Sequence, residues 1–170
     1  MRITVLALIL AAAIGTPAAG APPDSAKSSP AFDKLKSLVG SWKGKDEEGK
    51  PVTISYKVVS AGTSIMETLD MAENKEAMVT MYHPNGRTLM MTHYCSMGNQ
   101  PRMKTKGLSK DGKTLSFSFI DATNLASPKD NYMHRLVFTF KDDDHISQAW
   151  TMLMEGKNEH PAMFEFERVK

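Results

Sequence analysis

The sequence predicts an all-β fold, an antiparallel up-and-down β-barrel of roughly eight to ten strands with one short N-terminal helix. From Val52 onward, apolar residues recur at every second position in one segment after another, which is the period of a strand with one buried face. Turn signals rich in Gly and Asp separate these segments, and no helical pattern lies between them. Closure into a barrel also removes the edge strands that an open sheet would expose.

The first residues have the pattern of an export signal, which we assign to 1–20. Arg2 precedes the apolar run "ITVLALILAAAI" (3–14), and small residues follow. This run of about a dozen residues is shorter than the roughly 20 that a membrane-spanning helix needs, so no membrane span is expected after the leader is removed. Residues 21–30 are expected to form a flexible tether, and 31–170 a single barrel domain. The expected location is the periplasm or the outside of the cell.

Composition argues against some classes of partner. The chain has 21 basic and 19 acidic residues and no basic run. Nucleic acids and other polyanions are therefore not expected to bind, because their recognition needs a positive surface. The single cysteine, Cys95, cannot form an internal disulfide, so the apolar core alone must stabilise the fold.

A single helix is predicted immediately before the first strand. Ser29 is suited to be its N-cap, and Pro30 to be its first helical residue. Gly40 is suited to a left-handed C-cap. The apolar residues at helical spacing are Phe32, Leu35, Leu38 and Val39.

The strands are expected in order along the rest of the chain, with hairpin turns at "PNG" (84–86), "KDG" (110–112) and "KDDD" (141–144). A first strand directly follows the helix. The later segments are "VTISYKVV" (52–59), "TSIMETL" (63–69), "EAMVTMYH" (76–83), "RTLMMTHYC" (87–95), "RMKTKGL" (102–108), "KTLSFSFID" (113–121), "YMHRLVFTF" (132–140), "HISQAWTMLM" (145–154) and "AMFEFERVK" (162–170).

The segment "LVGSWKG" (38–44), in which a helix leads into Gly-x-Trp on the first strand, resembles the opening of calycin-type barrels: lipocalins, fatty-acid-binding proteins and nitrobindin-like haem proteins. The resemblance implies that Trp42 packs across the closed end of the barrel and that Arg168, in "FEFERVK", stacks over it. The order "LVGSWKG … THYC … GNQPRM … ISQAWT … FEFERV" more closely resembles secreted bacterial lipocalin-like domains of unknown function. This closer resemblance implies a fold rather than an activity.

In a barrel, strict alternation assigns one face of each strand to the interior. An apolar interior with a few polar groups is typical of a small-molecule pocket, and 13 methionines favour an adaptable cavity. The residues assigned to the interior are Leu89, Met91, His93 and Cys95 on one strand; Tyr132, His134, Leu136, Phe138 and Phe140 on a second; Ile146, Gln148, Trp150, Met152 and Met154 on a third; and Phe164, Phe166 and Arg168, with His160, on the last.

We therefore hypothesise that the barrel binds a small apolar or amphipathic molecule and performs no covalent chemistry. Arg102, which follows the turn "GNQP" (98–101), is suited to recognise a carboxylate or phosphate. The alternative is a structural or partner-binding barrel whose centre is filled by its own side chains. The expected ligand-binding residues are Met91, His93, Cys95, Arg102, His134, Gln148 and Trp150.

The stretch "MTHYCSMGNQPRM" (91–103) also raises catalytic and metal hypotheses. His93 and Cys95 on one strand face lie about 6.5–7 Å apart at the backbone, so a nucleophile–base pair would be poorly aimed and an enzyme is not expected. The same two residues could join His134 or His160 around a metal ion. No close-spaced pair of ligands supports such a site.

A haem hypothesis comes from the nitrobindin-like resemblance, which implies an axial histidine shortly before the terminal Arg. His160 stands eight residues before Arg168, and Pro161 departs from that pattern. A haem- or metal-binding redox protein that uses His160 or His93 is therefore the second hypothesis. In the first hypothesis no cofactor is expected.

Overall fold

The computed structural model describes residues 29–72 and 74–170. The expected leader (1–20) and nearly all of the expected tether lie outside the described residues. Within them, one α-helix and ten strands form a closed antiparallel barrel, as the sequence predicts. The elements are α1 (Pro30–Lys36), β1 (Gly40–Lys45), β2 (Pro51–Val59), the 3₁₀ turn η2 (Ser60–Gly62), β3 (Ser64–Met71), β4 (Met78–Asn85), β5 (Thr88–Tyr94), β6 (Gln100–Leu108), β7 (Thr114–Thr123), β8 (Tyr132–Phe140), β9 (His145–Met154) and β10 (Asn158–Arg168).

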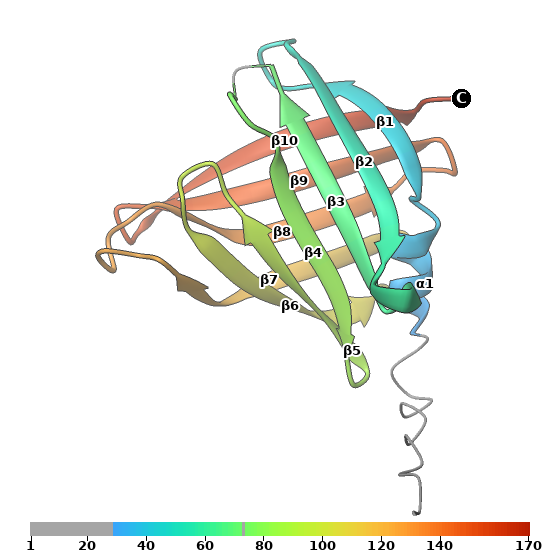
Figure 1. The fold of residues 1–170 in the computed structure, drawn as a ribbon, viewed down its shortest axis with the longest axis horizontal. Coiled ribbons are helices and arrows are strands. Elements are labelled where there is room, and N and C mark those ends of the chain that lie inside the picture. The colour runs from blue at the N-terminus through green and yellow to red at the C-terminus, as the bar shows by residue number, and fades with distance from the viewer. Residues whose placement is uncertain (1–28, 73) are drawn as a thin grey trace, which may run out of the picture.

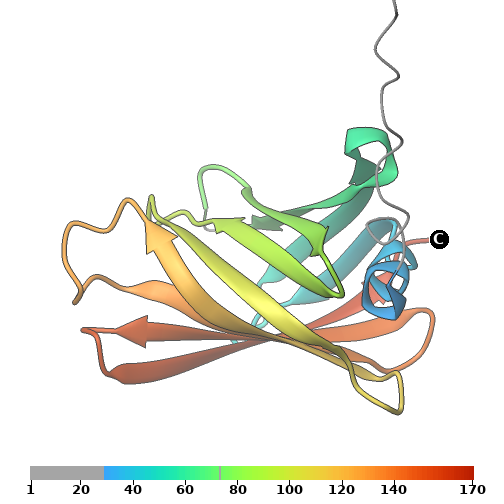
Figure 2. The same cartoon turned by 90° about the horizontal axis from the view of Figure 1, so that it is seen from below.

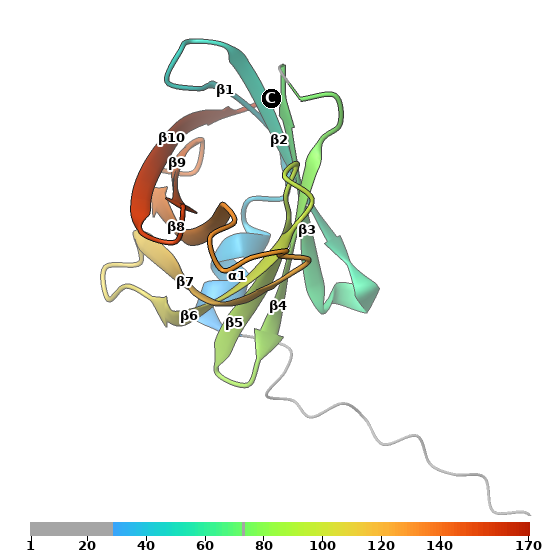
Figure 3. The same ribbon diagram turned by 90° about the vertical axis from the view of Figure 1, so that its left-hand side faces the viewer.

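The strands follow one another around the barrel in chain order (Figure 1). Each pairs with its neighbours in the sequence, and β1 pairs with β10 to close the ring. Figure 3 looks along the barrel and shows the ring of strands, with α1 visible inside it at the far end. The polypeptide therefore forms a meander with one covered end.

Helix α1 covers that end of the barrel (Figure 2). Ser29 caps it as predicted, because its hydroxyl accepts a hydrogen bond from the Phe32 backbone nitrogen at 3.2 Å. The expected cap at Gly40 is wrong: the helix ends at Lys36, and Ser37 is its C-cap. Gly40 instead begins β1 with a φ of +125°, which lets the chain turn sharply from the helix into the sheet.

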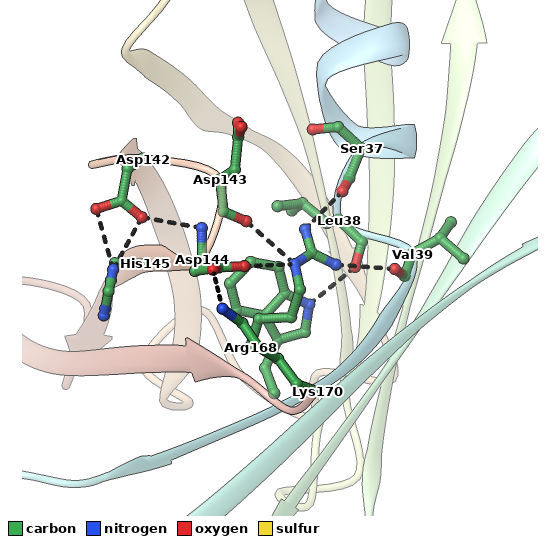
Figure 4. A network of polar contacts seen from close by, with 10 residues as sticks. Ser37, Leu38, Val39, Asp142, Asp143, Asp144, His145, Arg168 and Lys170 are labelled. Carbon is green, nitrogen blue, oxygen red and sulfur yellow. Dashed lines mark hydrogen bonds and ion pairs between the residues drawn. The ribbon is translucent and has the colours of Figure 1, made fainter.

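The first and last strands are joined by the contact that the calycin resemblance implies. Trp42 and Arg168 are register partners in β1 and β10, and the guanidinium lies 4.2 Å from the centroid of the indole ring. The same guanidinium donates to the backbone carbonyls of Ser37 at 2.8 Å, Val39 at 3.0 Å and Asp143 at 3.1 Å (Figure 4). One side chain thus connects β10 to β1, to the end of α1 and to the β8–β9 turn.

The inward faces agree with strict alternation on β5. On β9 they agree only in part, because Ser147 is buried as well and the expected Met152 and Met154 are half-buried like their neighbours. Leu89, Met91 and His93 are buried, as are Gln148 and Trp150. The alternation predicted for β8 is wrong at its beginning. The register shifts between Met133 and Arg135, so His134 is the extra residue of a β-bulge and lies out of step with the buried residues that follow it on β8.

We predict that Arg168→Lys destabilises the fold by about 2 kcal/mol, because a lysine cannot stack on the indole and donate to three carbonyls together. Arg102→Lys is the matched control. Arg102 pairs with Asp121 on the exposed surface, so its replacement is expected to cost less than about 1 kcal/mol. Urea unfolding of both variants measures the difference. Equal losses of stability would show that the Arg168 contact is not what closes the barrel.

Candidate functional site

The barrel interior is filled near α1. Phe32 and Leu35 of the helix are completely buried there. Further inside, the rings of Tyr82, Phe117 and Phe138 pack against one another with centroids 5.6–6.4 Å apart. This part of the barrel has the filled centre that one of the sequence-based hypotheses describes.

A cavity of about 270 Å³ occupies the other end of the barrel. Met71 is the last residue of β3 and Met133 stands near the start of β8, whereas the β8–β9 turn and the end of β10 adjoin α1. The cavity therefore lies at the end opposite the helix, and its volume is close to the lower limit for small-molecule sites. Its lining residues are Leu69, Met71, Asn74, Met78, His93, Cys95, Ser96, Met97, Met133, Trp150, Met152, Ala162 and Phe164.

A larger hollow of about 730 Å³ lies against β1 and β10. Charged residues supply much of its lining, and they pair with one another: Lys43 lies 3.9 Å from Glu167, and Lys141 contacts Glu165. These exposed ion pairs are well hydrated and contribute little to binding. The smaller, apolar cavity inside the barrel is therefore the candidate site.

A row of polar side chains crosses four neighbouring strands and ends at the cavity. Tyr56 on β2 is the register partner of Glu67 on β3, Glu67 is the partner of Thr80 on β4, and Thr80 is the partner of His93 on β5. All four residues are buried. We call them the polar row. Because register partners on one face have neighbouring Cβ atoms, the side chains of the polar row form a continuous line across the sheet.

The carboxyl of Glu67 is the centre of this network. Its Oε2 atom accepts hydrogen bonds from the Tyr82 hydroxyl at 2.8 Å and from Gln148 Nε2 at 2.9 Å. Gln148 Nε2 also donates to the Tyr56 hydroxyl at 2.7 Å. Burial raises the pKa of Glu67, and the hydrogen bonds from Tyr82 and Gln148 oppose this rise.

His93 connects the polar row to the cavity. Its Nδ1 atom lies 2.9 Å from Thr80 Oγ1, and its ring packs 4.7 Å from that of Trp150, whose own N–H donates to Gln148 Oε1. Only 1% of His93 is exposed, and burial lowers its pKa to about 4, so the imidazole is neutral at physiological pH. Its Nε2 atom makes no hydrogen bond.

That unpaired nitrogen distinguishes the cavity from the rest of the interior. In the described part of the chain, four buried side-chain atoms make no hydrogen bond, and they belong to Glu67, His93, Asn99 and His134. Of these four residues, only His93 lines the cavity. Buried polar atoms are nearly always paired, so His93 Nε2 is an available partner for a bound molecule.

Cys95 also lines the cavity, directly after the end of β5. Its backbone nitrogen donates to Asn99 O at 3.1 Å, which closes the turn that follows. Burial raises the pKa of the thiol, so it stays protonated and is a poor nucleophile. His93 Nδ1 pairs with Thr80 and His93 Nε2 makes no hydrogen bond, so the imidazole is not hydrogen-bonded to this protonated thiol and the two do not form an activated nucleophile–base pair.

The structure brings only some of the expected ligand-binding residues together. His93, Cys95 and Trp150 line the cavity, whereas Met91 and Gln148 are buried in the interior without lining it. Arg102 is exposed and paired with Asp121, and His134 Nε2 lies 3.3 Å from a carboxylate oxygen of Glu159. His160 is exposed near the start of β10 and does not line the cavity.

Glu67 and Thr80 are central to the site, and sequence reasoning missed both. In the sequence of β3, Glu67 alternates with the inward-facing Ile65 and Leu69, so the pattern itself predicts a buried carboxylate. A buried carboxylate is rare unless it has partners, and this could have identified the residue. Four of the five methionines that line the cavity come from the strands β3, β4, β8 and β9, and Met97 comes from the β5–β6 turn, so their meeting point depends on register between strands. The sequence pattern of a single strand does not carry that information.

No group of three or more His, Cys, Asp or Glu side chains suited to a metal ion occurs within residues 29–72 and 74–170. No helix in these same ranges has the length and apolar character needed to cross a bilayer.

Comparison with known proteins supports the fold. No protein-family model and no curated protein matches the sequence. The crystal structure of Rv2717c from M. tuberculosis is similar with a TM-score of 0.56 and 14% identity, over 84% of this chain and 99% of that chain. A protein of unknown function from the DUF3598 family of Nostoc punctiforme has a TM-score of 0.54 and 11% identity, over 79% of this chain and 49% of that one. At these identities the similarity is one of fold alone, and the calycin relationship stays a resemblance.

We predict that the buried, neutral His93 makes stability fall in acid. The folded pKa of about 4 lies below the unfolded value, so the unfolded chain binds the proton first and the loss develops as pH falls from about 6.5 to about 4. Glu67, with its raised pKa, has the opposite dependence, so the wild type must be compared with His93→Phe. Between about pH 7.5 and 4.5 the wild type should lose about 2 kcal/mol more than the variant in urea unfolding. Parallel pH profiles would contradict a neutral, buried imidazole.

Proposed function

We propose that this protein binds one small apolar or amphipathic molecule in the cavity at the open end of the barrel and performs no covalent chemistry on it. The observation that carries the proposal is the combination of an apolar cavity with one buried, unpaired nitrogen in its wall, His93 Nε2. Pockets for small molecules usually have this composition, in which apolar walls supply affinity and a few polar atoms supply orientation.

The walls of the cavity support a ligand of adaptable shape. Five of the lining residues are methionines, and the flat indole of Trp150 forms another part of the wall. Methionine is flexible and polarisable, so it fits irregular apolar surfaces. Binding would be driven by burial of ligand area at roughly 25 cal/mol per Å², reduced by the cost of ordering the ligand. The lining methionines are Met71, Met78, Met97, Met133 and Met152.

Export is part of the same proposal, and it is supported by the sequence of residues 1–20. A barrel that holds its ligand without a disulfide or a metal ion can act in the periplasm or outside the cell. In this proposal the protein collects or carries an apolar molecule through water, where such a molecule is poorly soluble.

Native mass spectrometry of the protein purified from its source organism, with an absorption spectrum of the same sample, tests the proposal directly. We expect a bound mass of a small organic molecule and no Soret band. A Soret band would instead support the haem hypothesis, with His93 or His160 as the ligand to iron. A bare protein mass in every preparation would favour a barrel without a ligand.

A matched pair of variants tests where the molecule binds. Ala162 lines the cavity, and Met163, the next residue on β10, is exposed on the opposite face. Ala162→Phe should fill the cavity and weaken binding of the apolar fluorophore N-phenyl-1-naphthylamine by about tenfold or more, whereas Met163→Phe should leave it unchanged. Circular dichroism confirms that both variants fold. Equal binding by the two variants would place the fluorophore outside the barrel.

A further inference from the structure

Sulfur is concentrated around the cavity at the open end of the barrel. Of the 13 described residues that line it, six carry a sulfur atom, namely the five methionines and Cys95. None of these 13 residues is Asp or Glu, so the wall lacks the carboxylates that hard cations such as Mg²⁺ and Ca²⁺ require. Thioethers are soft, uncharged ligands, and Cu(I) is the biological metal ion that they select.

The register of the strands brings thioethers to both sides of His93. Met78 lies two residues before Thr80 on β4, and Thr80 is the register partner of His93, so Met78 is a diagonal neighbour of His93 on the inward face. Across the barrel, the ring of Trp150 packs 4.7 Å from that of His93, and Met152 follows Trp150 by two residues in the same cavity wall. Methionine has three rotatable bonds, so its sulfur can move onto an ion held between the two walls.

His93 supplies a nitrogen ligand between these thioethers. The residue is only 1% exposed, its Nδ1 atom pairs with Thr80 Oγ1 at 2.9 Å, and its Nε2 atom makes no hydrogen bond. Because a hydroxyl can either donate or accept, Thr80 is compatible with a proton on either ring nitrogen. A metal ion at Nε2 would select the form that is protonated at Nδ1, and Thr80 would then accept the hydrogen bond from Nδ1. Metal-bound histidines usually make such a second hydrogen bond, which orients the ring.

We propose that the cavity is a binding site for Cu(I), held by His93 Nε2 and by the thioether sulfurs of Met78 and Met152. This inference goes beyond the proposed function and does not rest on it. Binding transfers no electron and releases no proton, because imidazole and thioether groups coordinate in their neutral forms. Cys95 is not a required ligand, since its thiol would first have to lose a proton. Zn²⁺ is not expected to bind, because the described residues contain no cluster of His, Cys, Asp or Glu side chains for it.

Anaerobic titration of the purified protein with Cu(I), kept reduced by ascorbate and in competition with the chromogenic chelator bicinchoninate, tests the proposal. Leucine has nearly the volume of methionine and lacks the sulfur, so the fold should tolerate the exchange. Met78→Leu and Met152→Leu should each weaken Cu(I) binding by at least about the tenfold that is typical of a lost second-shell partner. Met91→Leu is the matched control, because Met91 is buried in the same barrel and does not line the cavity, and it should bind as the wild type does.

Two further variants separate this site from a lone thiol. Cys95→Ser should keep most of the affinity for Cu(I), whereas His93→Phe should lose it, with circular dichroism to confirm that both variants fold. Loss of binding in Cys95→Ser, with both leucine variants at the lining methionines unaffected, would place the metal on the thiol and overturn the inference. A wild-type protein that takes no Cu(I) from bicinchoninate, or that binds Zn²⁺ as tightly, would overturn it as well. Binding of N-phenyl-1-naphthylamine to the copper-free protein is measured separately, so failure of the metal site leaves the proposed function in place.

Discussion

The pairing of β1 with β10 is the constraint on which the rest of this structure depends, and Arg168 is the side chain that secures it. A ten-strand meander without a disulfide has two free edges until its ends meet. The guanidinium stacks on Trp42 and donates to the carbonyl of Ser37, so it fixes β10, β1 and the end of α1 in one place. Because α1 is held there, one end of the barrel is filled, and any space for a ligand must lie at the other end.

The polar row places side chains that are unfavourable to bury in the middle of the core. Burying a carboxyl and a phenol costs free energy unless each finds a partner, and here Gln148 bridges Glu67 and Tyr56 from the far side of the barrel. This network forms in only one register, since a shift by one residue would turn Glu67 outward and separate it from Gln148. The row therefore favours one register among the strands β2, β3, β4 and β5. The same register places His93 at the cavity.

Much of the fold could be predicted from the sequence, because period-two alternation is a property of one strand at a time. It correctly placed Leu89, Met91 and His93 on the inside of β5. It failed at His134, because a bulge adds a residue without leaving a mark in the pattern of hydrophobic residues. The site was less predictable for a different reason. Glu67 and Thr80 matter through their alignment across strands, and which part of the barrel stays empty depends on how aromatic side chains such as Phe117 fill the remainder.

Burial in the barrel also lowers the reactivity of the imidazole and the thiol that line the cavity. In a low-dielectric environment the charged form of each group is disfavoured, so the imidazole of His93 loses its proton and the thiol of Cys95 keeps its own. A catalytic His–Cys pair needs the opposite arrangement, with an imidazolium stabilising a thiolate. Two residues that suggest chemistry in the sequence thus become, inside this barrel, one neutral polar group and one small apolar surface. Both effects have one physical cause, the loss of water around the two side chains, and both favour the neutral forms that the proposed binding of an apolar molecule requires.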